Sequence, residues 1–289
     1  MTPLQETEFT LLKKAIEICD ELEIKYYLAC GSALGAIKYK GFIPWDDDVD
    51  ICMTRKDYEI FCERAPALLP DYYFLQNVNS EKNTPFIFSK LRDSRTTFVE
   101  KSISHMNINH GVYIDIFPLD GYPREVKAQN AFERNLRILK LQLNSAYRFE
   151  KNVKLLTKLF FRLEKVLGFH RRTYQIIKKI NCLITKYSIG DSELWCNHGN
   201  WQGKLDYAPQ WHYGDGAWAT FEGMKVRVPE NYDAYLTQKY GNWREDLPES
   251  QKYGHHYCEI IDLNHPYTSY IDSISTDGRN IKLISKLEE

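Results

Sequence analysis

Four aspartates crowd one short stretch of the chain: Asp46, Asp47, Asp48 and Asp50. The apolar run 49–53 has the length and composition of a β-strand. Side chains alternate along a strand, so we expect Asp48 and Asp50 to share one face. Two such carboxylates repel each other unless a cation lies between them. Oxygen ligands favour Mg²⁺, which often binds one or two carboxylates together with substrate phosphates.

A small-residue turn precedes these acids. The apolar run 26–30 predicts a strand that ends at Gly31 and Ser32, and the segment 32–38 predicts a short helix. Backbone N–H groups at the start of such a helix can hold a phosphate. Lys38 and Lys40 follow, either as groups that neutralise phosphate or as a solvated basic turn.

A second acidic motif lies in the segment GVYIDIFPLDG, residues 111–121. Strand alternation places Asp115 on one face with Tyr113 and Phe117. An aspartate flanked by apolar residues in a buried strand is costly unless it is paired or binds a metal. Asp120 is expected to cap the turn or helix that follows.

The run GSALGAIKYKGFIPWDDDVDI closely resembles the LicD family of the nucleotidyltransferase superfamily. That family includes phosphocholine transferases of bacterial surface glycans and, more distantly, fukutin and fukutin-related protein. The segments GVYIDIFPLDG and KLRDSRTTFVE and the region 221–241 also match its pattern. Tyr39 is a departure, since the family usually has His there. The resemblance covers nearly the whole chain and is weakest over 125–215.

The resemblance implies an α+β fold, in which a nucleotidyltransferase-like mixed sheet is flanked by helices. We expect a catalytic core over 1–124 and a helical, basic region over 125–190. A C-terminal region over 191–289 would complete the active site, and the three would form one compact unit.

The activity that the resemblance implies is transfer of a phospho-alcohol, with phosphocholine the best-known case. The donor would be activated by cytidine diphosphate, and the acceptor would be a hydroxyl of a cell-surface glycan or of its lipid-linked precursor. Asp48, Asp50 and Asp115 would bind one or two Mg²⁺ or Mn²⁺ ions. Asp46 or Asp115 would take the proton of the acceptor hydroxyl.

The remaining candidate residues would contact the donor phosphates. They are Gly31, Ser32, Lys38, Lys40, Lys90 and Arg92. For Arg92 the alternative is an exposed position on an edge strand. His255 and His256 are candidates for a phosphate contact or for help in deprotonating the acceptor, and a polar surface role is equally open.

Two other classes of function remain open on the sequence. One is an enzyme with another donor, which would transfer ribitol phosphate, phosphoethanolamine or a nucleotide. The other is a non-catalytic protein that binds a glycan or nucleotide, although the three intact acids argue against it.

Composition bounds the function further. The chain has 289 residues and a net charge of −1, which gives no argument for nucleic-acid binding. Seven scattered cysteines indicate reduced thiols in a cytoplasmic protein. Cys196 and His198 leave a zinc site open, but no second ligand pair accompanies them. No signal peptide is expected, and no apolar run approaches the ~18–20 residues that cross a bilayer.

Two regions keep alternative interpretations. The segment 151–186 has ten Lys or Arg against one acid, Glu164. Its apolar faces are expected to pack on the core, and the alternative is docking at an anionic membrane surface. The aromatic residues of 195–218 suit a choline cage, sugar stacking or an irregular core.

Overall fold

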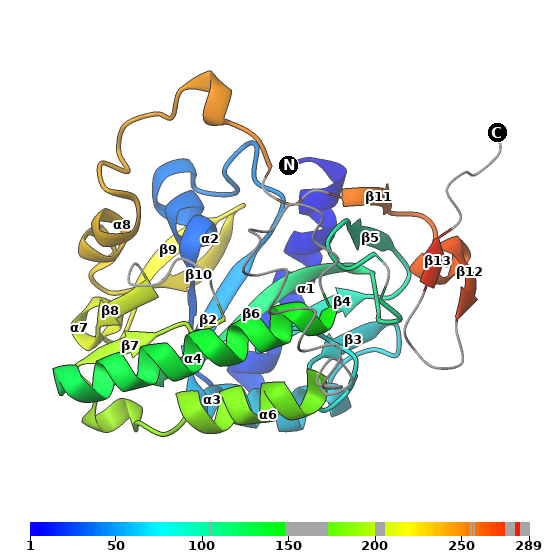
Figure 1. Cartoon of the computed structure of the whole chain (residues 1–289). Coiled ribbons are helices and arrows are strands. Elements are labelled where there is room, and N and C mark those ends of the chain that lie inside the picture. Colours follow the sequence, from blue (N-terminus) through cyan, green and yellow to red (C-terminus); the bar gives the residue numbers. More distant parts are fainter. Residues whose placement is uncertain are drawn as a thin grey trace.

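A mixed β-sheet lies at the centre of the molecule (Figure 1). The computed structural model describes residues 1–104, 106–147, 173–199, 206–254, 256, 258–274 and 281–283. The main path of the sheet runs β1-β2-β6-β4-β3, and β7 joins β6 to β8. These strands are β1 Tyr26–Leu28, β2 Asp50–Thr54, β3 Tyr73–Gln76, β4 Ser89–Asp93, β6 Val112–Gly121, β7 Leu194–Cys196 and β8 Tyr207–Pro209. Only the β2–β6 pair is parallel within the sheet as described.

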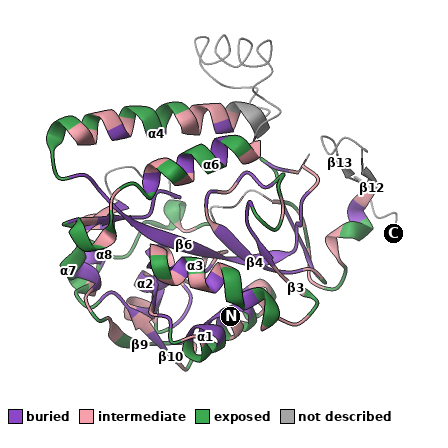
Figure 2. Cartoon of the chain, turned by 90° about the horizontal axis from the view of Figure 1, so that it is seen from below, coloured by how far each residue is buried: buried purple, intermediate pink, exposed green. Residues whose placement is uncertain are grey.

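Helices cover the sheet on two sides (Figure 2). α1 (Pro3–Glu21) and α3 (Arg55–Arg64) pack on one side, where both contact β6. α4 (Val126–Tyr147) and α6 (Thr173–Ile184) pair with each other on the other side. Two apolar clusters follow this division. The larger unites the sheet with α1 and α3, and the smaller lies beneath α4 and α6.

Shorter elements frame the sheet. They are α2 (Cys30–Leu34), the π-helical turn η1 (Gly35–Tyr39), η2 (Ala65–Ala67), η4 (Ile189–Asp191), α7 (Gln210–Tyr213), α8 (Tyr232–Tyr240), η6 (Glu249–Gln251) and η7 (Tyr267–Tyr270). Three small antiparallel pairs complete the described fold: β9 (Ala217–Phe221) with β10 (Met224–Val228), β5 (Thr97–Glu100) with β11 (Cys258–Asp262), and β12 (Ile271–Ile274) with β13 (Ile281–Leu283).

The start of α1 is fixed by local capping, and one face of the helix is buried. Thr2 and Gln5 form a reciprocal capping box, and Pro3 occupies the first helical turn. Its inward face carries Leu11, Leu12 and Ile18, all fully buried. The Gln5 side chain also donates a hydrogen bond to the Asp46 carbonyl oxygen, 3.0 Å away. The first turn of α1 is thereby tied to the acidic loop.

The α+β fold predicted from the sequence is confirmed, and some local expectations change. The segment 32–38 does not continue as one α-helix, because α2 ends at Leu34 and η1 follows. The helical region 125–190 and the C-terminal region 191–289 were expected to form one compact unit with the core 1–124. Both β7 and β8, from the C-terminal region, pair into the central sheet, while β11 pairs with β5.

Asp120 does not cap a turn or helix as expected. Its carboxylate accepts two hydrogen bonds from the Arg55 guanidinium, at 2.7 and 2.6 Å. Asp120 is 1% exposed, so this bidentate pair lies almost wholly inside the protein. The sequence expectation failed because the partner lies on α3, far away in the chain.

The other structural observations concern thiols and membranes. All seven cysteines are free, as expected for reduced thiols. None of the helices in the described part of the chain is both long and apolar enough to span a bilayer. Most of the basic segment 151–186, from 151 to 172, lies outside the described residues.

We expect Asp120→Ala to lower the free energy of unfolding by about 3–5 kcal/mol, because it leaves the Arg55 charge buried and unpaired. Urea unfolding of wild type and variant measures the difference. The matched control is Glu193→Ala, which breaks an exposed ion pair with Arg124 and is expected to cost about 0–1 kcal/mol. Equal losses in the two variants would contradict this account.

Candidate active site

Asp50 and Asp115 lie side by side at the centre of the sheet. They are register partners on the parallel strands β2 and β6, and both are buried. The Asp50 amide donates to the Ser32 hydroxyl oxygen at 2.9 Å, and the Asp50 carbonyl oxygen accepts from the Ala29 amide. The backbone around Asp50 is therefore held by the first turn of α2 and by the residue before that helix.

Asp47 and Asp48 form a second acidic group with His256. Potential ligand atoms of these three residues all lie within 4.8 Å of one another, and no other such group of three occurs among the described residues. His256 Nδ1 lies 3.0 Å from Asp47 Oδ1, and His256 Nε2 lies 4.0 Å from Asp48 Oδ2. The His256 amide also donates to Asp47 Oδ2. A residue from the C-terminal region thus reaches the acidic loop.

The crowding of these acids shows in their proton affinities. Burial raises the pKa of Asp46 to about 8, and the charges of Asp48 and Asp47 add to this effect. Burial likewise raises the pKa of Asp50, followed by the charges of Asp48 and Asp115. Such mutual repulsion is what a divalent cation relieves. The donor set, carboxylate oxygens with one imidazole, suits Mg²⁺ or Mn²⁺.

Lys90 is the counter-charge of Asp115. Its Nζ lies 2.8 Å from Asp115 Oδ1, and 3.3 Å from the centre of the Tyr113 ring. Burial raises the pKa of Asp115, and the charge of Lys90 opposes that rise. Lys90 is itself 2% exposed. Its first contact is therefore with a predicted metal ligand rather than with an open phosphate site.

The predicted trio of metal ligands is brought together only in part. Asp50 and Asp115 are neighbours, and Asp48 is close enough to influence both of their pKa values. Their oxygens do not all fall within 4.8 Å of one another, however, and one oxygen of Asp115 is held by Lys90. Asp47, which the prediction left out, is the acid that joins Asp48 and His256.

Gly31 and Ser32 lie beside the acids as predicted. A Cβ atom on Gly31 would approach Asp46 Oδ2 to 2.7 Å, so glycine lets the Asp46 side chain come close to the turn. Ser32 is buried and its hydroxyl accepts the Asp50 amide hydrogen. Whether this turn binds phosphate is a proposal taken up below.

Lys38, in η1, and Lys40, which directly follows η1, have different surroundings. Lys38 Nζ pairs with Asp246 at 2.9 Å and donates to the Glu245 carbonyl oxygen at 2.8 Å, so it is occupied by the C-terminal region. Lys40 is exposed and adopts a left-handed conformation with φ of 62°. Its carbonyl oxygen accepts from Glu222, at the tip of the β9–β10 hairpin.

Arg92 is neither on an exposed edge nor open to solvent. Strand β4 lies between β6 and β3, and Arg92 has no exposed surface. Its guanidinium donates to Gln76 Oε1 at 2.6 Å and to the Gly111 carbonyl oxygen at 2.7 Å. The edge-strand expectation is wrong, and the predicted phosphate contact has no access. Sequence reasoning could not see that β6 covers the other side of β4.

His255 lies outside the described residues, so its predicted role stays a prediction. Glu8 is a further residue near the acids that sequence reasoning missed. It lies on α1, is 2% exposed, and burial together with the charges of Asp48, Asp47, Asp46 and Asp115 raises its pKa. A lone acid on the inward face of an amphipathic helix was the available signal.

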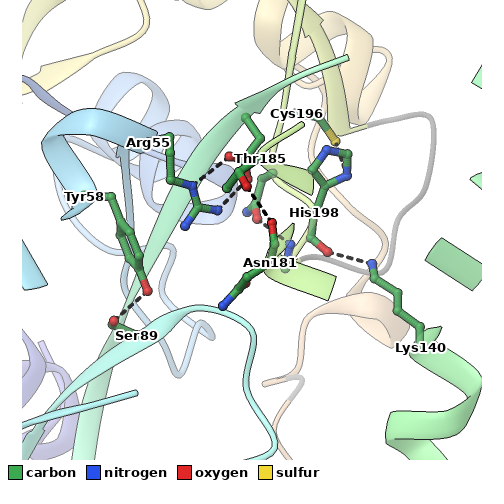
Figure 3. A network of polar contacts seen from close by, with 11 residues as sticks. Arg55, Tyr58, Ser89, Lys140, Asn181, Thr185, Cys196 and His198 are labelled. Atoms are coloured by element: carbon green, nitrogen blue, oxygen red, sulfur yellow. Dashed lines mark hydrogen bonds and ion pairs between the residues drawn. The ribbon is translucent and has the colours of Figure 1, made fainter. Parts of the chain in front are cut away.

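Cys196 and His198 do meet, as Figure 3 shows, with Sγ and Nδ1 3.4 Å apart. Lys140 Nζ donates to the His198 carbonyl oxygen. Burial lowers the pKa of His198 to about 3, and the charges of Lys140 and Arg55 lower it further. No third metal ligand joins the pair among the described residues, so the structure adds no support for zinc.

The aromatic residues of 195–218 do not gather into one cluster within the described part of this region. Trp195 is buried and stacks on Tyr213, with ring centres 5.5 Å apart. Trp211 and Trp218 are exposed, and Lys225 and Arg227 cover the Trp218 ring. Trp201 lies outside the described residues.

Residues 23–138 match the family described as LicD/FKTN/FKRP, nucleotidyltransferase domain. Over 258 residues the chain is 28% identical to the lipopolysaccharide cholinephosphotransferase LicD of Haemophilus influenzae, covering 85% of this chain and 92% of that protein. It is also 31% identical over 115 residues to an uncharacterized protein of Rickettsia prowazekii, 40% of each chain. The chain thus contains a segment that matches the nucleotidyltransferase domain of the LicD family.

The matched range of the LicD-family domain contains Asp46, Asp47, Asp48, Asp50 and Asp115. It excludes both α1, with Glu8, and His256. The likeness to the Haemophilus protein extends over most of the chain, which agrees with a site assembled from segments on both sides of the matched range.

We expect the metal-free protein to lose stability as the pH rises from about 6.5 to about 9. Burial lowers the pKa of His256, but its contact with Asp47 and the charge of Asp48 outweigh this and raise it to about 9. The stabilisation from protonated His256 is complete below its ordinary pKa and is lost as pH rises through 9. The raised pKa of Asp46 acts in the same direction between about 4 and 8.

Urea unfolding in EDTA at about pH 6 and about pH 9.5 measures this loss, and His256→Gln should reduce it by on the order of 2 kcal/mol. The control is His265→Gln, an exposed histidine paired with Asp262. A pH dependence unchanged in His256→Gln would show that the contact with Asp47 is not formed in solution.

Proposed function

We propose that this protein is a metal-dependent transferase that moves phosphocholine from a CDP-activated donor to a hydroxyl of a cell-surface glycan or its lipid-linked precursor. The proposal rests first on the activity for which the Haemophilus relative is named, lipopolysaccharide cholinephosphotransferase, because that protein resembles most of the chain. It rests also on the acidic centre, since phosphoryl transfer depends mainly on positioning and on stabilising charge.

The observation that carries the proposal is the convergence of carboxylates from two parts of the chain. Asp50 is the register partner of Asp115 on the neighbouring strand, and Asp46, Asp47 and Asp48 precede β2 in the chain. Burial raises the pKa values of Asp46, Asp50 and Asp115, and the charge of Asp48 raises each of them further. Asp47 and Asp48 with His256, and Asp50 with Asp115, would hold one or two Mg²⁺ or Mn²⁺ ions. The bound ions would neutralise the donor phosphates and the departing cytidine monophosphate.

The chain's own residues supply the other parts of the reaction. The acceptor oxygen attacks the phosphorus atom that carries choline, and the bond from that phosphorus to the cytidine monophosphate oxygen breaks. We assign removal of the acceptor proton to Asp46, because its carboxylate lies beside Gly31, next to the place proposed for the donor phosphates. Asp115 is less suited, since Lys90 already holds one of its oxygens.

Donor phosphates would lie over the Gly31–Ser32 turn. Its closeness to Asp46 and Asp50 supports this placement, because a metal held by the acids would then bridge to the phosphates. Lys40, which directly follows η1, is an exposed basic group. Lys38, Lys90 and Arg92 are each engaged within the protein, so we assign them to support of the site rather than to direct phosphate contact.

The donor is tested by the group that remains on the acceptor. The protein is incubated with Mg²⁺, a glycan acceptor and the cytidine-diphosphate derivatives of choline, ethanolamine or ribitol, and the product is analysed by mass spectrometry. We expect a phosphocholine adduct from the choline donor. An adduct of ribitol phosphate or phosphoethanolamine alone, or transfer of the nucleotide itself, would replace the proposed activity with one of those reactions.

A non-catalytic binding role makes a different prediction. Donor binding would then raise the melting temperature without any product, because a ligand that binds the native state stabilises it whether or not it reacts.

We expect Asp48→Asn to lower the rate of phosphocholine transfer by roughly 10²-fold or more, since it removes a charged metal ligand at the centre of the site. Its melting temperature without metal should equal or exceed that of wild type, because the substitution relieves repulsion with Asp46 and Asp50. Steady-state kinetics and thermal unfolding measure the two effects.

The matched control is Asp71→Asn, an exposed aspartate that should leave both quantities unchanged. Full activity in Asp48→Asn would remove Asp48 from the metal site.

A further inference from the structure

Glu8 is an acid in an unusual position. It lies on α1 one turn after Gln5, and the residues that follow it on the inward face, including Leu11 and Leu12, are apolar and fully buried. Glu8 is 2% exposed, and its Oε2 atom has no hydrogen-bond partner among the residues that the structure describes. A buried carboxylate without a partner is costly, so its environment has to supply either a proton or a cation.

The position of α1 aims this side chain at the acidic centre. The Gln5 amide holds the acidic loop through the Asp46 and Ile43 carbonyl oxygens, at 3.0 and 3.4 Å. Glu8 follows three residues later, on the same face of the helix. The charges that act on Glu8 are those of Asp48, Asp47, Asp46 and Asp115, which are the acids of the site.

A purely structural role explains these facts poorly. Packing alone would be better served by an apolar residue, as at the buried positions of α1 from Leu11 to Cys19. An ion pair within the fold would need a basic partner, yet none of the described residues donates to Glu8 Oε2. The nearby cations have other partners, since Lys90 pairs with Asp115 and His256 pairs with Asp47.

We propose that Glu8 contributes a further carboxylate oxygen, through one bridging water, to the divalent cation bound by Asp47 and Asp48. This inference rests on the metal site of the proposed function and extends it to a helix that lies outside the matched family range. Residues that orient or supplement metal ligands typically change the affinity for the metal 10–100-fold.

The test measures Mn²⁺ binding directly. Protein is stripped with EDTA, dialysed, and titrated with Mn²⁺ while the signal of the free ion is followed by electron paramagnetic resonance. We expect Glu8→Gln to weaken Mn²⁺ binding about tenfold or more. Glu6→Gln, an exposed acid on the same helix, should bind as wild type does, and Asp48→Asn should show the loss expected of a metal ligand.

A second variant keeps the test sharp if Glu8→Gln does not fold, as judged by circular dichroism. Glu8→Met has a similar length and suits a buried position, and it should show the same loss of Mn²⁺ affinity. Wild-type affinity in either folded variant would overturn the inference and leave Glu8 a structural residue. Absence of Mn²⁺ binding by the wild-type protein would overturn it as well.

The outcome is separable from that of the proposed function. If the Mn²⁺ affinity depends on Glu8 but no phosphocholine adduct forms, the Glu8 inference stands and the substrate assignment fails. If the adduct forms and Glu8→Gln binds Mn²⁺ as wild type does, the substrate assignment stands and the Glu8 inference fails.

Discussion

Repulsion among carboxylates is the constraint on which the rest of this structure depends. Asp46, Asp50 and Asp115 are held in or near a protein interior where their ionised forms are disfavoured, and each raises the proton affinity of its neighbours. Burial of apolar side chains around the central sheet stabilises the fold enough to keep these groups together. In the proposed function, relief of this repulsion would favour the binding of a cation.

Several elements meet this constraint in different ways. Lys90, from the neighbouring strand β4, neutralises Asp115 inside an aromatic surround that includes Tyr113. His256 approaches from the C-terminal region and takes a proton beside Asp47 and Asp48. The backbone is secured separately, by Ser32 at Asp50 and by Gln5 at Asp46. Different residues thus control the charge of these acids and the position of their backbone. A metal that takes the place of the protons would therefore need no change in the surrounding fold.

The sequence predicted the elements near the acids well because those elements are local. The strands predicted at 26–30 and 49–53 are formed as Tyr26–Leu28 and Asp50–Thr54, although the first is shorter than expected and Gly31 and Ser32 lie in α2. Predictions failed where a residue's role depends on a distant segment. Arg92 was misjudged because β6 lies beside β4, and Asp120 because Arg55 lies on α3. Asp47 was left out because its partner is 209 residues away.

By itself the sequence determined the fold class, the resemblance to the LicD family and the acids that a metal-dependent reaction needs. Each of these depends on residue type, spacing and alternation within short stretches of the chain. Only the tertiary structure decided how these acids are balanced. It paired Asp115 with Lys90, brought His256 to Asp47 and turned Glu8 towards the acidic centre. Such pairings arise when elements distant in the chain pack together, and the charge on a buried group is set by whatever that packing places around it.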